Sequence, residues 1–276
     1  MSDTDKKIVG HYQLGDLFEQ ITNGLREMGK TMSALVPEDL KPVDEFHIGG
    51  FEATKALLDQ LKIDKTTDVL DIGCGLGGTA RFITAQYGSA VTGIDLTPDF
   101  VETAKKLSAA LGMKASFSVG SALDLPFKEE SFDLVTLFHV GMNLPDKPKL
   151  FSEVARVLRP GGKFAVYDVM QTGDQLPAFP VPWASDKSQS FVEKPEAYVA
   201  AATAAGLTLD TQRERSGFAV EFFEKQMAQI KNMTKMPFGL PMLMGKDAAE
   251  KIGNMKNAVG AGQVAPIEMI FTKPMA

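Results

Sequence analysis

Apolar and polar residues follow two alternating patterns through the middle of the chain. Short, largely apolar runs predict strands at 68–72, 90–95, 115–119, 132–138 and 163–169. Between them, apolar positions recur at helical spacing in 79–87, 98–111 and 147–158. Strands separated by helices of this length are typical of βαβ units. The pattern therefore predicts an α/β fold with a mostly parallel sheet.

Helical spacing also precedes this core. Apolar positions in 10–36 predict one or two amphipathic helices, which we expect Pro37 and Pro42 to end. The turn 45–50 then leads into a helix whose buried face is formed by Ala53, Leu57, Leu58 and Leu61. We expect residues 1–60 to form an N-terminal helical cap.

The C-terminal third predicts helices at 195–205, 219–233 and 248–259 and strands at 207–215 and 267–272, with a break rich in Pro, Gly and Met at 236–244. The last strand is expected to close a seven-stranded sheet as an antiparallel edge. Residues 61–276 would form the core, with helices on both faces of the sheet. Substrate-side insertions are expected near 170–195 and 217–264, the second of them helical and placed before the last strand.

Composition narrows the function. The chain has 276 residues, enough for one large domain, and its net charge of −6 gives no support for nucleic-acid binding. The single cysteine, Cys74, excludes an intramolecular disulfide and a multi-cysteine zinc site, so no metal is expected. No apolar run approaches the length of a membrane span, and the polar N-terminus does not resemble a signal peptide. We expect a cytoplasmic monomer or homodimer that binds neither membranes nor nucleic acids.

A glycine-rich loop links the first predicted strand to its helix. Gly73, Gly75, Gly77 and Gly78 follow the apolar run that ends at Ile72. Glycines let a backbone approach a ligand closely, and the N-terminus of the helix offers unpaired N–H groups. The pattern also fits the dinucleotide fingerprint, which keeps an NAD(P)-dependent oxidoreductase among the candidates.

Two acids flank this loop. Asp95 ends the second predicted strand, where a carboxylate can accept both ribose hydroxyls of a nucleoside. Its other possible role, capping the helix that begins at Pro98, is better filled by Thr97. Asp71 precedes the glycines and should be buried, so it needs partners. It could order the loop through backbone N–H groups or face a cationic part of a ligand.

Several motifs carry a resemblance when they are taken in order. They are Asp71-x-Gly73-x-Gly75-x-Gly77, Gly93-Ile-Asp95, Leu125-Pro-Phe127, Ser131-Phe-Asp-Leu-Val135 and Leu158-Arg-Pro-Gly-Gly162. Together they resemble the class I S-adenosylmethionine (SAM)-dependent methyltransferases, whose fold is Rossmann-like. Within that superfamily, the segments 46–54 and 180–184 are similar to the sarcosine/dimethylglycine N-methyltransferases. The core also resembles the ubiquinone/menaquinone C-methyltransferases.

The resemblance implies SAM as cofactor and assigns residues to it. Gly73, Gly75 and Gly77 would face its amino-acid and ribose portion, and Leu96 and Ala122 would flank the adenine. Ser121 stands where many relatives carry an acid that accepts a hydrogen bond from the adenine amine. A neutral serine can still accept that bond, but the contact is expected to be weaker.

The acceptor side is less constrained by the sequence. His139, after the fourth strand, could be a general base or could orient SAM or its loop. Tyr12 could close over the methyl group. Trp183 could form a wall of the substrate pocket or pack an insertion onto the core, and His47 could contact substrate or be structural.

These features predict a methyltransferase acting on a small-molecule acceptor, and we expect an amine of the sarcosine/dimethylglycine type. A C- or O-methyltransferase of a quinone-like or polyketide-like molecule is the alternative. An NAD(P)-dependent oxidoreductase is disfavoured by Asp71 before the loop and by the later motifs, and a non-catalytic SAM-binding protein is the remaining candidate.

Overall fold

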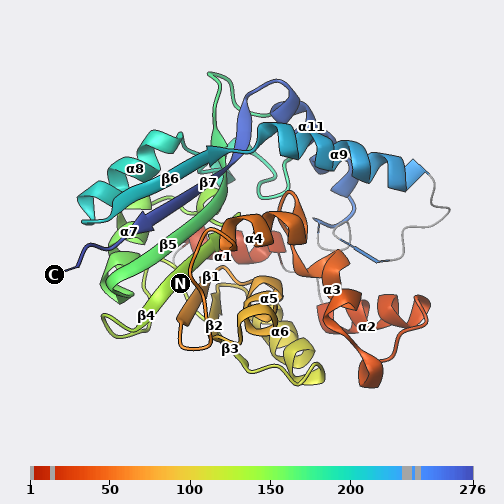
Figure 1. Ribbon diagram of the computed structural model, residues 1–276. Helices are drawn as coiled ribbons and strands as arrows, with labels where there is room; N and C mark the ends of the chain where they lie inside the picture. The colour runs from red at the N-terminus through yellow and green to blue at the C-terminus, as the bar shows by residue number, and fades with distance from the viewer. Residues whose placement is uncertain (1–2, 13–15, 232–237, 240–243, 276) are drawn as a thin grey trace.

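The computed structural model describes residues 3–12, 16–231, 238–239 and 244–275, and within them a seven-stranded sheet forms the centre of the molecule (Figure 1). Five strands are parallel and lie in the order β3-β2-β1-β4-β5. Their bounds are β1 (Asp68–Ile72), β2 (Ala90–Asp95), β3 (Ala115–Val119), β4 (Phe132–Phe138) and β5 (Leu158–Gln171). The predicted mostly parallel sheet is confirmed.

The last two strands complete the sheet in an order that the sequence did not predict. Strand β7 (Val264–Thr272) is antiparallel and lies between β5 and β6 (Thr208–Glu214), so β6 forms the edge. The antiparallel direction of the last strand is confirmed, but its expected position at the edge is wrong. All residues of β7 except the last are buried, whereas most of β6 is exposed. The more apolar strand takes the inner position because both of its faces are covered.

Helices cover both faces of the sheet, as expected. On β4, Leu134 packs with the helices α4 (Gly50–Leu58), α5 (Gly78–Tyr87) and α6 (Pro98–Ala110). The next residue, Val135, belongs to the opposite cluster, to which α7 (Lys147–Val157) and α8 (Pro195–Ala204) contribute Phe151 and Tyr198. Adjacent residues of one strand thus face two separate apolar layers, which is the arrangement of a doubly covered α/β sheet.

The N-terminal region is helical and includes a helix that was not expected. It consists of α1 (Asp3–Tyr12), α2 (Leu17–Glu27), the short turn η1 (Met32–Ala34) and α3 (Pro37–Asp44). The expectation that Pro37 and Pro42 end the helical section is wrong, because both lie within α3. Proline is tolerated at the first position of a helix, where the missing N–H would have no partner.

Two helices lie together at one end of the sheet, α9 (Ser216–Lys231) and α11 (Ala248–Gly260) (Figure 1). They match the predicted helices over the described residues, but most of the break at 236–244 lies outside them. The short turns η2 (Gly141–Asn143) and η3 (Lys187–Gln189) belong to loops that follow β4 and β5. Across the described ranges, no helix is both long and apolar enough to cross a membrane. The boundaries of the cap and insertions stay a prediction.

A buried ion pair fastens the N-terminal region to the core. Arg81 on α5 donates through Nη2 to Oδ1 of Asp44, at the end of α3, and through Nε to Oδ2 at 3.2 Å. Its Nη1 donates to Oγ of Ser108 at 3.1 Å. Burial raises the pKa of Asp44 to about 6, against the opposing effect of the Arg81 charge. In the interior, the charge of Asp44 is therefore compensated by that of Arg81.

Replacing Arg81 by Met should destabilise the fold by about 3–5 kcal/mol, because a buried carboxylate loses its partner. Denaturant unfolding measures this change. Lys55→Met is the matched control, since Lys55 and Asp59 form an exposed pair whose side chains are 47% and 51% accessible. That variant should change the free energy of unfolding by about 1 kcal/mol at most. Equal losses in the two variants would contradict the role given to the buried pair.

Candidate active site

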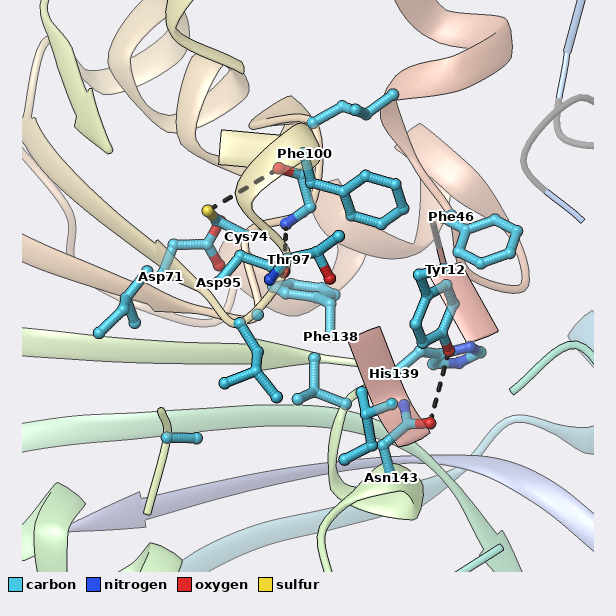
Figure 2. Close-up of a pocket in the computed structure, with 18 of the residues that line it drawn as sticks. Tyr12, Phe46, Asp71, Cys74, Asp95, Thr97, Phe100, Phe138, His139 and Asn143 are labelled. Carbon is cyan, nitrogen blue, oxygen red and sulfur yellow. Dashed lines mark hydrogen bonds between the residues drawn. The ribbon is translucent and has the colours of Figure 1, made fainter. Parts of the chain in front are cut away.

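A cleft lies at the carboxyl ends of the parallel strands, where the loops after β1, β2, β3 and β4 meet (Figure 2). This is the edge at which parallel α/β sheets bind ligands. Gly77 lies at the start of α5 and Trp183 lies in a neighbouring pocket, so neither lines the cleft. The other residues selected from the sequence all line it: Tyr12, His47, Asp71, Gly73, Gly75, Asp95, Leu96, Ser121, Ala122 and His139.

The glycine loop has the backbone conformation that glycine favours. Gly73, Gly75 and Gly77 have φ values of 68°, 51° and 83°. A Cβ atom on Gly73 would lie 2.2 Å from the Val140 side chain, and one on Gly77 would lie 2.7 Å from the Phe117 ring. Nothing lies within 4 Å of the same position on Gly75. Gly73 and Gly77 therefore allow the loop to pack closely, whereas Gly75 borders open space in the cleft.

Asp95 holds this loop from the end of β2. Its Oδ2 accepts the backbone N–H of Gly75 at 3.0 Å, and its Oδ1 accepts that of Thr97 at 2.8 Å. Burial raises its pKa, although these hydrogen bonds favour the ionised form. Thr97 is the N-cap residue of α6, as expected, although its side chain makes no capping hydrogen bond. A carboxylate can accept several hydrogen bonds, so a ligand hydroxyl could share Asp95 with these donors.

Asp71 has one protein partner in its buried position. Its Oδ1 accepts from the Thr136 hydroxyl at 2.8 Å, whereas Oδ2 has no hydrogen-bond partner among the described residues. Burial raises the pKa of Asp71 to about 7. No backbone N–H donates to it in the described structure, so it does not order the loop in that way. A cationic group of a ligand would satisfy the unpaired oxygen.

The far end of the cleft is bordered by the loops after β2 and β3. Leu96 and Ala122 line it, together with Ser121, whose hydroxyl accepts the Leu123 N–H at 3.2 Å. Phe100 is a lining residue that sequence reasoning missed. It lies in the first turn of α6, five positions after Asp95, and its position next to the acidic strand end was the available signal. The Phe100 ring lies 5.9 Å from that of Tyr12, between centroids, so it borders the side of the cleft nearer to α1. A flat apolar base would find aliphatic surface from Leu96 and Ala122 at the far end.

A second, mainly apolar pocket adjoins the cleft on the side of α9 and α11. The two share Tyr12, Phe46, His47 and His139, so these four residues form a common neck. The described lining of the second pocket contains no Asp, Glu, Lys or Arg. Its remaining residues are Ile48, Met142, Val169, Pro182, Trp183, Phe222, Phe223, Gln226, Met244, Ile252 and Met255.

His139 lies at this neck, directly after β4 (Figure 2). Its φ of 53° is uncommon for a residue other than glycine, and its backbone N–H donates to the Tyr167 carbonyl at 2.7 Å. Its Nε2 is buried without a hydrogen-bond partner among the described residues. Burial and the nearby His47 hold the pKa of His139 well below its ordinary value. The imidazole is therefore neutral near pH 7 and has a nitrogen available to a ligand.

Tyr12 brings α1 to the neck from the opposite side. Its hydroxyl donates to Oδ1 of Asn143, on η2, at 3.4 Å, and its ring packs edge-on against Phe46 (Figure 2). Burial raises the pKa of Tyr12, so the hydroxyl keeps its proton. Tyr12 can therefore donate a hydrogen bond at the junction of the two pockets. Asn143 is a second lining residue that the sequence did not reveal, because its role depends on this contact.

His47 and Trp183 are both buried, and both border the second pocket. Nε2 of His47 lies 2.7 Å from Oε2 of Glu45. Trp183 donates through Nε1 to the Ser190 hydroxyl at 2.9 Å. Trp183 belongs to an apolar cluster that contains Met142 and residues of the insertions such as Phe223 and Met255. The two roles considered for Trp183, pocket wall and packing residue, are thus compatible.

No group of three His, Cys, Asp or Glu residues suited to a metal occurs in the described part of the chain.

Comparison with known proteins agrees with this geometry. A methyltransferase-domain family matches residues 70–166. Tocopherol O-methyltransferase of Arabidopsis thaliana is 41% identical over 110 residues, which are 39% of this chain and 32% of that protein. Methyltransferase GfsG of Streptomyces halstedii is 30% identical over 165 residues, 58% of this chain and 59% of that protein. The chain thus spans less than two thirds of the length of these relatives.

Solved structures share the fold over more of the chain. Geranyl diphosphate C-methyltransferase from Streptomyces coelicolor A3(2), solved with S-adenosyl-L-homocysteine, has a TM-score of 0.72 at 16% identity. The match covers 99% of this chain and 98% of that one. A candidate sarcosine dimethylglycine methyltransferase from Galdieria sulphuraria has a TM-score of 0.66 at 22% identity, covering 82% of this chain and 86% of that one.

The matched domain, the sheet order and the glycine loop with its two acids agree with one another. The cofactor of this domain is SAM, as the resemblance implied. Residues 70–166 thus form a methyltransferase domain of the class I SAM-dependent type.

Proposed function

We propose that this protein transfers the methyl group of SAM to a small molecule held in the second pocket. The observation that carries the proposal is the neck shared by the two pockets, formed by Tyr12, Phe46, His47 and His139. Methyl transfer needs a cofactor site and an acceptor site that meet at one point, because the displacement is in line. The neck provides such a meeting point between a polar cleft and an apolar pocket.

Several residues of the cleft suit SAM, which when bound supplies an activated methyl group on a sulfonium. Asp95 would hold the ribose hydroxyls, and Asp71 would face a cationic part of the ligand through its unpaired oxygen. Gly73 and Gly75 would let the backbone approach it, and Gly77 would support the loop at the start of α5. Leu96, Ser121 and Ala122 would surround the adenine, and Phe100, next to Tyr12, would add an aromatic surface nearer to the neck.

The lining of the second pocket favours a neutral and largely apolar acceptor. Sarcosine and dimethylglycine carry a carboxylate, and the described lining contains no Lys or Arg to bind one. Trp183, Phe222 and Phe223 offer aromatic surface, and Met142, Met244 and Met255 offer adaptable packing. Of the two acceptor classes considered from the sequence, a quinone-like or polyketide-like ring fits this pocket better than a small amino acid does.

His139 and Tyr12 would act at the neck. The unpaired Nε2 of His139 could accept a proton from an acceptor that arrives protonated. The Tyr12 hydroxyl could orient the reacting group, while its ring and that of Phe46 exclude water. Trp183 and His47 would contact the acceptor. A monomer or homodimer in the cytoplasm remains our expectation for the whole protein.

A turnover assay tests this proposal. With SAM present, a dimethyl-hydroquinone should raise the formation of S-adenosylhomocysteine at least ~10-fold above the rate without acceptor, since a bound and aligned acceptor gains a large effective molarity. Sarcosine and dimethylglycine at equal concentration should leave that rate unchanged. Stimulation by the two amines but not by the ring would contradict the acceptor assignment and restore the amine hypothesis.

A further inference from the structure

A buried polar cluster includes the neck residue His47, and the proposed roles of His139 and Tyr12 do not use it. Glu45, His47 and Thr54 are 6%, 6% and 0% exposed. Oε2 of Glu45 accepts the Thr54 hydroxyl at 2.8 Å and lies 2.7 Å from Nε2 of His47. The Thr54 hydroxyl also lies 3.0 Å from the same nitrogen. The Glu45 carboxylate is thus held by His47 and Thr54, which lie close to it in the sequence.

The surroundings of His47 favour its doubly protonated form. Its Nε2 faces the Glu45 carboxylate, and its Nδ1 lies 3.4 Å from the Ile48 carbonyl oxygen. Both oxygens can only accept hydrogen bonds, so both ring nitrogens are satisfied together only when each carries a hydrogen. The hydrogen-bond geometry therefore suits a Glu45–His47 ion pair.

This ion pair lies against the reactive neck. The His47 ring lies 5.6 Å from the ring of His139 and 5.7 Å from that of Tyr167, between centroids, and 5.3 Å from the ring of Phe138. The charged or titratable groups around His47 are Glu45, His139 and Tyr167. The charge of Glu45 in turn interacts with those of Asp44 and Asp71. Since the described lining of the second pocket contains no Lys or Arg, His47 is its candidate source of positive charge.

We propose that the Glu45–His47–Thr54 cluster stabilises an anion at the neck, and that the acceptor is a largely apolar ring with a weakly acidic hydroxyl. This inference rests on the proposed methyltransferase function and names its acceptor class. An imidazolium in an apolar pocket favours a phenolate or enolate over a neutral hydroxyl, and it opposes a cationic amine. Glu45 and Thr54 act through His47 and are positioning residues.

The atoms and charges of the step balance without a further reactant. The acceptor O–H bond breaks, and its proton passes to Nε2 of His139. The oxygen gains the methyl group as the methyl–sulfur bond breaks with its electron pair left on sulfur, so a cationic sulfonium becomes a neutral thioether. The positive charge of His47 opposes lasting protonation of His139, in line with the low pKa of His139, and favours release of the proton to solvent.

The protonation of His47 can be measured without any substrate. The chain has three histidines, so nitrogen-15 NMR of their side chains gives a small spectrum, which His11→Gln helps to assign. At pH 7 we expect His47 to show two protonated ring nitrogens and His139 to show one. A neutral His47 would overturn the inference and would leave the proposed function intact.

Glu45→Gln tests the consequence for catalysis, with Glu52→Gln as the matched control because Glu52 is exposed on the first turn of α4. With a dimethyl-hydroquinone, Glu45→Gln should lower kcat/KM about 10- to 100-fold and leave SAM affinity unchanged, because an electrostatic stabiliser at the reacting centre is lost. The acid limb of the pH–rate profile should move up by about one pH unit as His139 loses a cationic neighbour. Glu52→Gln should change neither quantity.

The substrate half of the inference has its own pair of probes. The dimethyl-hydroquinone should be methylated at oxygen, and its dimethyl ether, which lacks an ionisable hydroxyl, should give no S-adenosylhomocysteine above background. An unchanged kcat/KM in Glu45→Gln, or methylation of the ether at a comparable rate, would overturn the inference. Failure of the protein to bind SAM would instead overturn the proposed function. If Glu45→Gln does not fold, the NMR measurement decides.

Discussion

Asp95→Ala should weaken SAM binding by about 10²–10⁴-fold while the protein stays folded. In the free protein the carboxylate accepts the backbone N–H groups of Gly75 and Thr97 at 3.0 and 2.8 Å. The substitution therefore removes the proposed ribose contact and also frees the loop that carries Gly75. Hydrogen bonds to a charged group are each worth about 1.5–3 kcal/mol, which gives a change of this size for two of them. Calorimetric titration with SAM measures it.

Glu102→Ala is the control for this prediction. Glu102 is an exposed acid on α6, the helix that follows Asp95, and it lies outside the lining of both pockets. Its removal changes the net charge by the same amount and should leave the dissociation constant within about twofold, because exposed charges contribute little. Near-normal affinity in Asp95→Ala would remove the ribose assignment. A loss of equal size in both variants would mean that overall charge, and not the loop, governs binding.

His139→Ala should lower kcat about 10²–10⁴-fold and change SAM affinity by no more than a few fold. The reason is that the unpaired Nε2 lies at the neck between the two pockets, where the acceptor is proposed to lose its proton. Because burial and His47 hold the pKa of His139 well below its ordinary value, the base is neutral throughout the pH range above it. The wild-type rate should therefore fall only as the pH drops through that lowered value.

The left-handed backbone of His139, with φ of 53°, requires a second variant. Asparagine adopts this conformation more readily than alanine, so His139→Asn separates loss of the base from strain in the backbone. Both variants should retain their melting temperature within a few degrees and show the same loss of kcat. If SAM affinity falls in parallel with kcat, His139 orients the cofactor or its loop and is not a base.

Much of the nucleotide half of the site follows from local pattern. The strand ending at Ile72, the glycine loop and Asp95 can be read from the sequence because parallel strands bring their carboxyl ends to one edge. The loops that carry Ser121 and His139 reach the same edge for the same reason. The order of strands on the other side of β5 could not be read in this way. It depends on how well β6 and β7 are buried, and that is decided by contacts distant in sequence.

The acceptor half was harder to predict, because its residues come from separate elements. Tyr12 on α1 meets Asn143 on η2, 131 positions away. Trp183 and Met255 border the same pocket from the loop after β5 and from α11. No spacing rule joins such positions. The Glu45–His47–Thr54 cluster lies within ten residues, yet a short polar pattern does not reveal that all three side chains are buried.

Pocket lining also changes the interpretation of the acceptor. The short motifs around Phe46 and Trp183 favoured an amine, whereas the apolar surface around Phe222 and Phe223 favours a ring. Similar motifs indicate a shared fold. The acceptor depends instead on the side chains that the insertions near 170–195 and 217–264 bring to the pocket. The acceptor class therefore rests on the lining residues and their charge.

The most direct test of the central claim is a parallel calorimetric titration of the purified protein with SAM, S-adenosylhomocysteine and NAD. We predict saturable binding of both adenosyl ligands, lost in Asp95→Ala, and no binding of NAD. Binding of NAD without binding of SAM would contradict the account from the glycine loop outward.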